Sequence, residues 1–85
     1  MAQPRTWALI GAGAAGTAVM ALLVRRGHRL EALWSRRRAR AKAARFLIGK
    51  GRVAATAAEA AAAADVLLLA VPDGAITGVA VLMVW

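Results

Sequence analysis

The chain contains no cysteine and a single histidine, His28, among its 85 residues. Without thiols it cannot form a disulfide framework or a thiolate metal site, and one imidazole alone cannot assemble a metal cluster. Acidic residues are also scarce: four Asp and Glu stand against 12 Lys and Arg, which leaves a net charge of +8. Because concentrated positive charge attracts anions, the composition favours a partner such as phosphate, nucleic acid or an acidic membrane surface.

The chain is short and apolar. It is 61% hydrophobic and 19% charged, so we expect a single folded domain over residues 1–85. Residues 7–24 carry no charge over 18 positions, a length that just reaches the threshold for a membrane span and also suits a signal peptide. About half of that stretch is Gly, Ala or Thr, and three spaced glycines interrupt it. We therefore expect a cytoplasmic protein, with a membrane anchor through residues 7–24 as an alternative.

Short apolar runs alternate with stretches of helical spacing. Strands are predicted at residues 6–10, 29–34, 52–56 and 65–71. Helices are predicted at residues 14–26, 37–48 and 57–64. A further helix is expected to begin near Ala75, with Asp73 as its N-cap. This alternation predicts an α/β, Rossmann-like parallel sheet that is partial, with about four strands joined by crossover helices.

Apolar spacing also predicts which side of each element is buried. The expected buried residues are Ala15, Val19, Leu22 and Leu23 in the first helix, Leu30, Ala32 and Trp34 in the second strand, and Ala39, Ala43, Phe46 and Leu47 in the second helix.

The sequence GAGAAG, residues 11–16, fits the pattern G-x-G-x-x-G between the first strand and the first helix. In a dinucleotide-binding unit, Gly11 would allow the tight turn, Gly13 would let the backbone approach the pyrophosphate, and Gly16 would let the helix pack against the sheet. The backbone N–H groups at the start of the helix would then face the phosphates. A glycine-rich turn without a ligand is the structural alternative.

The second strand ends where such a fold contacts the adenine ribose. An acidic residue there would favour a free 2′-hydroxyl, but this chain has Ser35, Arg36 and Arg37. A hydroxyl and guanidinium groups attract a 2′-phosphate, which predicts NADP (NADPH) as the cofactor. Ligands also lie beyond the carboxyl ends of parallel strands, so Val71 and Pro72, at the end of the last predicted strand, are expected to line the cofactor.

The whole chain resembles the N-terminal NADP-binding domain of the 6-phosphogluconate dehydrogenase-like group, which includes pyrroline-5-carboxylate reductase and a poorly characterised family of Rossmann-like oxidoreductases. The matching segments are IGAGAAGTA, RRGHRL, WSR and ADVLLLAVPDGAI. The resemblance implies an oxidoreductase that transfers hydride to or from a small molecule. It also implies cofactor contacts at Gly11, Gly13, Ala14, Ala15, Gly16, Ser35, Arg36, Val71 and Pro72.

Members of that group continue with more strands and a helical domain. We therefore expect this chain to be a truncated half-domain that is incomplete as a catalyst, with its substrate and catalytic residues unassigned. A homodimer is expected only with that C-terminal region.

The basic run from Arg36 to Arg45 leaves a nucleic-acid-binding module as a further alternative. Six cations lie in these ten residues, but the run lacks interleaved aromatic side chains that could stack on bases. Phe46 is near, on the stripe predicted to be buried.

Overall fold

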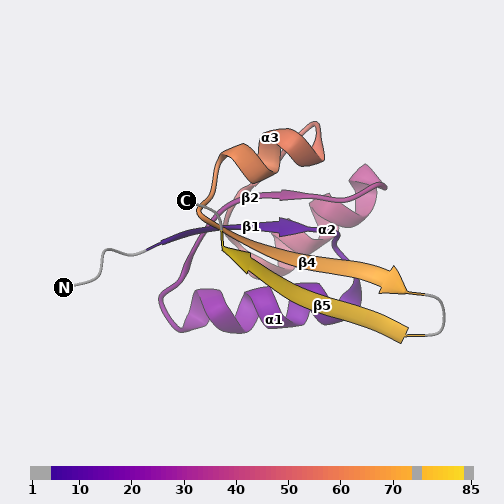
Figure 1. Cartoon of the computed structure of the whole chain (residues 1–85), viewed down its shortest axis with the longest axis horizontal. Helices are drawn as coiled ribbons and strands as arrows, with labels where there is room; N and C mark the ends of the chain where they lie inside the picture. The colour runs from indigo at the N-terminus through magenta and orange to yellow at the C-terminus, as the bar shows by residue number, and fades with distance from the viewer. Residues whose placement is uncertain (1–4, 74–75, 84–85) are drawn as a thin grey trace.

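A computed structural model describes residues 5–73 and 76–83. The chain forms the elements β1 (Thr6–Ile10), α1 (Ala14–Arg25), β2 (Arg29–Trp34), α2 (Arg38–Ile48), β3 (Arg52–Val53), α3 (Ala57–Ala62), β4 (Val66–Asp73) and β5 (Ile76–Met83). The strands make one sheet in the order β3-β2-β1-β4-β5 (Figure 1). The first four strands are parallel to one another, which confirms the predicted partial Rossmann-like α/β sheet.

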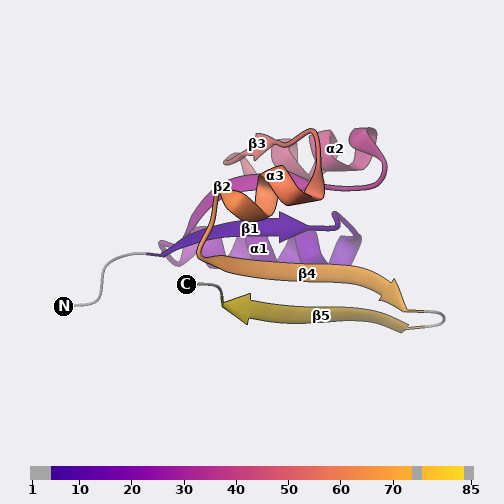
Figure 2. The same cartoon turned by 45° about the horizontal axis from the view of Figure 1, so that its top comes forward.

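Helices cover both faces of the sheet. Figures 1 and 2 show α3 on one side and α1 on the other. The core on the α1–α2 side is built around Leu9, Met20, Leu33 and Leu68, which are fully buried. The core on the α3 side is smaller and consists of buried alanines, with Ile10 and Trp34 packed against them. Most of the apolar burial therefore lies beneath α1 and α2.

The predicted helix after residue 75 is wrong, because Ile76–Met83 forms β5, antiparallel to β4. Pro72 does not end the preceding strand either, since β4 extends through Asp73 and Pro72 pairs with Thr77. The sequence ITGVAVLM explains the difference. It is rich in β-branched residues, which favour strands, and it lacks the charged face that a helix on a sheet presents to water.

The predicted buried face is wrong in part for α1, where Leu23 does pack against the core, and wrong for α2. In α1 the buried residues are Gly16, Thr17 and Met20, whereas Val19 and Leu22 are 37% and 53% exposed. Gly16 faces the sheet because a side chain there would overlap Ala70, and the residues that share its side of the helix are Thr17 and Met20 rather than Val19 and Leu22.

In α2 the contrast is stronger. Ala41 and Ala44 are buried, whereas Phe46 and Leu47 are 84% and 72% exposed. Ala39 and Ala43 are exposed as well. The apolar stripe predicted from the sequence is therefore present, but it faces solvent, and the sheet is contacted by a second, narrower stripe of alanines that ends at Ile48.

A bulge in β2 changes which side chains share a face. Trp7 pairs with Leu30, but the next residue, Ala8, pairs with Ala32, so Glu31 is an extra residue. One inserted residue reverses the alternation. As a result Leu30 packs in the α1–α2 core and Ala32 in the α3 core, and the prediction that both lie on one face is wrong.

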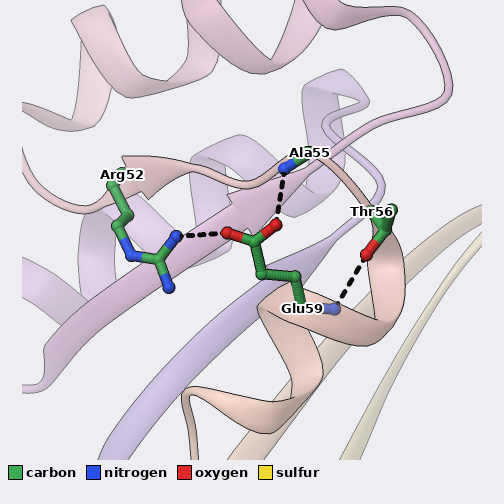
Figure 3. Close-up of polar contacts among 4 residues, drawn as sticks. All are labelled: Arg52, Ala55, Thr56 and Glu59. Atoms are coloured by element: carbon green, nitrogen blue, oxygen red, sulfur yellow. Dashed lines mark hydrogen bonds and ion pairs between the residues drawn. The ribbon is translucent and has the colours of Figure 1, made fainter.

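Local residues account for the end of α1 and the start of α3. Gly27 adopts φ +95° after α1, and the N–H of His28 donates to the carbonyl of Leu23 at 3.0 Å, as in a glycine-terminated helix. Thr56 caps α3 by accepting a hydrogen bond from the backbone N–H of Glu59 at 3.0 Å (Figure 3).

Glu59 ties α3 to the strand before it. Its carboxylate accepts hydrogen bonds from the Arg52 guanidinium at 2.8 Å and from the backbone N–H of Ala55 at 3.3 Å (Figure 3). The hydrogen bond from Arg52 is the main reason that the pKa of Glu59 lies below its ordinary value.

The uncharged stretch 7–24 is divided between β1, a loop and the first eleven residues of α1. Within the described residues, no helix has the length and hydropathy needed to cross a bilayer. The anchor through residues 7–24 therefore has no support as a transmembrane helix.

Candidate nucleotide site

The loop between β1 and α1 requires glycine at two of its three spaced positions because of one neighbour, Ala70. Gly11 has φ +90°, and a Cβ built on it would overlap the carbonyl oxygen of Ala70. A Cβ on Gly16 would overlap the Cβ of Ala70 and lie 3.5 Å from Leu9 Cδ1. The end of β4 thus holds the loop and the first turn of α1 in close contact with the sheet.

Gly13 differs from the other two glycines. Its φ of −72° is open to any residue, and a Cβ built on it would meet no protein atom within 4 Å. The chain itself therefore does not require glycine at this position. A side chain at position 13 would extend into the open space in front of the loop.

The start of α1 offers uncompensated backbone donors to that space. Gly13 is the N-cap, no side chain caps the helix, and its first turn contains no acidic residue. Ala14 and Ala15 are exposed in this turn. Free N–H groups and the positive end of the helix dipole make such a terminus attractive to anions.

The end of β2 lies against the same loop. The backbone N–H of Gly11 donates to the carbonyl oxygen of Trp34 at 2.7 Å. The segment that follows Trp34, residues 35–37, therefore leaves the sheet beside the glycine loop. Ser35 is half-buried, whereas Arg36 and Arg37 are exposed.

The local charge around these arginines is uniformly positive. Arg37 is the N-cap of α2, whose first turn contains no acidic residue. Across residues 5–73 and 76–83, the ion pairs join Arg29 to Glu31 and Arg52 to Glu59, so neither Arg36 nor Arg37 is neutralised by a described carboxylate. Both guanidinium groups are available to an external anion.

The last pair of predicted residues lies at the same edge of the sheet, but not in a loop. Ile10 pairs with Leu69, so β4 passes the end of β1 by four residues. Val71 and Pro72 belong to that extension and pair with Gly78 and Thr77 of β5. Both residues therefore lie within a strand, and their backbone lies beyond the carboxyl end of β1.

Arg40 is a candidate that the sequence interpretation missed, because it appeared to be one more cation on a solvated helix. It lines a shallow groove of about 470 Å³ between α1 and α2, together with Ala12 and Ala14 of the glycine loop. The signal was its spacing: one turn of α2 after Arg36 and Arg37, Arg40 returns to the side that faces α1.

His28 lies elsewhere, at the opposite end of α1. Its ring makes an edge contact with Trp7, with centroids 5.3 Å apart. Among the described residues no group of three or more His, Asp or Glu could hold a metal.

This strand order, with a glycine loop between the central strand and a helix, defines a Rossmann-like α/β domain. The chain belongs to the family described as NADP oxidoreductase coenzyme F420-dependent, whose model matches residues 6–83. It is therefore an NADP oxidoreductase-type Rossmann domain, which confirms the resemblance found in the sequence.

Solved structures agree with this assignment. A protein described as an NADP oxidoreductase from Bacteroides fragilis is 25% identical, with a TM-score of 0.73 over 85% of this chain. An imine reductase from Pseudomonas sp. is 26% identical, with a TM-score of 0.70 over 86% of this chain. The chain spans only 28% and 24% of the lengths of these two proteins. No curated protein matches the sequence.

Proposed function

We propose that this chain is the NADP(H)-binding half-domain of an oxidoreductase, with the cofactor lying across the carboxyl ends of β1, β2 and β4. The observation that carries the proposal is Gly13. Ala70 accounts for Gly11 and Gly16, but no protein contact accounts for Gly13. A ligand backed against the loop would account for it, because any side chain there would occupy the ligand's place.

The pyrophosphate fits the start of α1. The N-terminal turn, residues 14–16, supplies backbone N–H groups without a competing cap or carboxylate. Two phosphates gain from both the free donors and the helix dipole. In this arrangement Ala14 and Ala15 contribute through their backbones.

The 2′-phosphate of NADP fits the start of α2. Ser35 would offer a hydroxyl, and Arg36 and Arg37 would offer guanidinium groups with no described acidic partner. Arg40 would add a further cation from the groove it shares with Ala14. NAD, which lacks this phosphate, would leave the four side chains without an anion.

The bound cofactor would supply the hydride chemistry. The chain's own residues bind and orient it, while the small-molecule substrate and the catalytic groups stay unassigned. The family's description pairs NADP with coenzyme F420, and in this proposal the chain provides the NADP side of such a reaction.

The test compares NADPH and NADH binding to the chain and to Arg36→Ala/Arg37→Ala. Each lost hydrogen bond to a charged phosphate is worth about 1.5–3 kcal/mol, so NADPH affinity should fall by roughly tenfold to a hundredfold or more. NADH affinity should change little. The matched control is Arg26→Ala/Lys42→Ala, which removes the same charge at exposed positions outside residues 35–37.

The readout is a titration by calorimetry, with 2′,5′-ADP and 5′-ADP as fragments that isolate the phosphate. Unchanged NADPH affinity in the Arg36→Ala/Arg37→Ala variant would show that these arginines do not hold the 2′-phosphate. If the control variant lost as much NADPH affinity, the two arginines would contribute only through the net positive charge of the chain.

A further inference from the structure

The outer surface of the α1–α2 layer is apolar where a soluble domain normally presents charge. Four large hydrophobic side chains are exposed among the described residues, Val19 and Leu22 on α1 and Phe46 and Leu47 on α2. A side chain such as Phe46, which is 84% exposed, loses the stabilisation of burial. On α2 the two exposed side chains are adjacent in the sequence, and clustered exposed apolar residues mark interaction sites.

The apolar residues of α2 form a stripe along its solvent side. Ala39, Ala43, Phe46 and Leu47 follow helical spacing and are all exposed, while the opposite side, Ala41 and Ala44, is buried against the sheet. The larger apolar side chains of α2 therefore face away from the domain core.

Cations flank this stripe. Arg38, Lys42 and Arg45 follow one another at spacings of four and three residues, and all are exposed. No acidic residue occurs between Glu31 and Glu59 or anywhere in α1. An exposed apolar stripe bordered by Lys and Arg is the pattern of a helix that lies in the interface of an anionic bilayer.

We propose that the exposed face of α2, centred on Phe46 and Leu47, docks on an anionic lipid surface. The apolar side chains would enter the boundary between headgroups and acyl chains, and the flanking cations would contact lipid phosphates. A nucleic acid would satisfy the same charges but suits the stripe less well, because bases stack on aromatic rings and Phe46 is the sole aromatic residue between Trp34 and Trp85.

The experiment measures co-sedimentation of the 85-residue chain with vesicles of phosphatidylcholine alone and of phosphatidylcholine with phosphatidylserine. Binding is expected to the anionic vesicles and to weaken when salt is raised from about 0.1 M to 1 M, where the Debye length falls from roughly 10 Å to 3 Å. The variant Phe46→Ala/Leu47→Ala keeps the charge and should lower the partition coefficient by about tenfold or more.

A charge-matched pair separates this face from net charge. Phe46→Asp places one acid on α2, and Ala62→Asp places one acid at an exposed position on α3, across the sheet. The first should abolish sedimentation and the second should leave most of it. Circular dichroism and thermal melting check that both variants fold.

Any of four outcomes would overturn the proposal. The chain could fail to sediment with anionic vesicles, or Phe46→Asp and Ala62→Asp could weaken binding equally. Alternatively, light scattering could show a dimer, with twice the mass of the 8.8 kDa chain. In that case Phe46→Asp would restore the monomer mass and Ala62→Asp would not. That result would assign the face to a second copy of the chain. An oligonucleotide arm completes the test: loss of single-strand binding in Phe46→Asp, with vesicle binding unchanged, would assign the face to nucleic acid.

Discussion

Gly16 of α1 lies directly against Ala70 of β4, and a pair of substitutions can test this contact. Because a Cβ on Gly16 would overlap the Cβ of Ala70, Gly16→Ala must push α1 away from β4 or distort it. Overpacking a close-packed core costs about 1–3 kcal/mol, and the upper part of that range, about 2–3 kcal/mol, applies here because neither Cβ can rotate out of the overlap. The intrinsic advantage of Ala over Gly in a helix, about 1 kcal/mol, offsets part of that cost, so a net loss near 1–2 kcal/mol is expected.

The size of the domain converts this loss into a measurable shift. For a domain of 60–100 residues, 1 kcal/mol lowers the Tm by roughly 4–8 °C, so Gly16→Ala should melt about 4–16 °C below the wild-type chain. Replacing Ala70 by Gly removes the overlapping atom. The double variant Gly16→Ala/Ala70→Gly should therefore be more stable than the sum of the single effects by about 1 kcal/mol or more.

Thermal or urea unfolding, followed by circular dichroism, gives the four free energies of this cycle. The control pairs Gly16→Ala with Ala44→Gly, another buried alanine of the same core, which is not among the atoms nearest to Gly16. That combination should be additive. If the Ala70 cycle is additive as well, contact with Ala70 does not explain the glycine at position 16. The argument that Gly13 alone needs a ligand to explain it would then lose part of its basis.

Three further results are expected. Gly13→Val should leave the Tm within a few degrees of wild type, because its Cβ meets no protein atom, yet should abolish NADPH binding in a calorimetric titration; retained binding would contradict the pyrophosphate assignment. Arg40→Ala should weaken NADPH but not NADH binding, whereas Lys42→Ala, outside the groove, should weaken neither selectively. Glu59→Gln should destabilise the chain at neutral pH but not in acid. The folded-state pKa of Glu59 lies below its ordinary value of 4.5. The ionised carboxylate therefore contributes to the free energy of unfolding above pH 4.5, and this contribution is lost as the pH falls through the folded-state pKa. Urea midpoints measured between about pH 7 and pH 3 would show the two curves converging, and a constant offset would exclude the charged form of Glu59 as the cause.

Much of the architecture follows from local patterns in the sequence. The strands β1, β2 and β4, the helices between them, the glycine after α1 and the cap at Thr56 were all predictable, because each depends on residues that are neighbours along the chain. The same holds for the glycine loop and for the segment after β2, since a parallel sheet brings the ends of its strands to one edge.

The predictions that failed concern contacts between distant segments. Spacing identified an apolar stripe on α2 correctly but assigned it to the core, because periodicity shows that a stripe exists and not which side the sheet occupies. The bulge at Glu31 was invisible for the same reason: it exists only in the pairing of β2 with β1.

The sequence by itself determined the Rossmann-like order of elements and the chemistry gathered near the nucleotide site, since short-range propensity and the charge of residues 35–37 do not depend on packing. Only the tertiary structure decided why each glycine is present, which cation joins the loop, and which face of α2 meets water. Those answers depend on the position of Ala70 and on the small residues that set the distance between helix and sheet. The basic run borders an exposed apolar stripe along its length, and its start is the proposed binding position of a nucleotide phosphate.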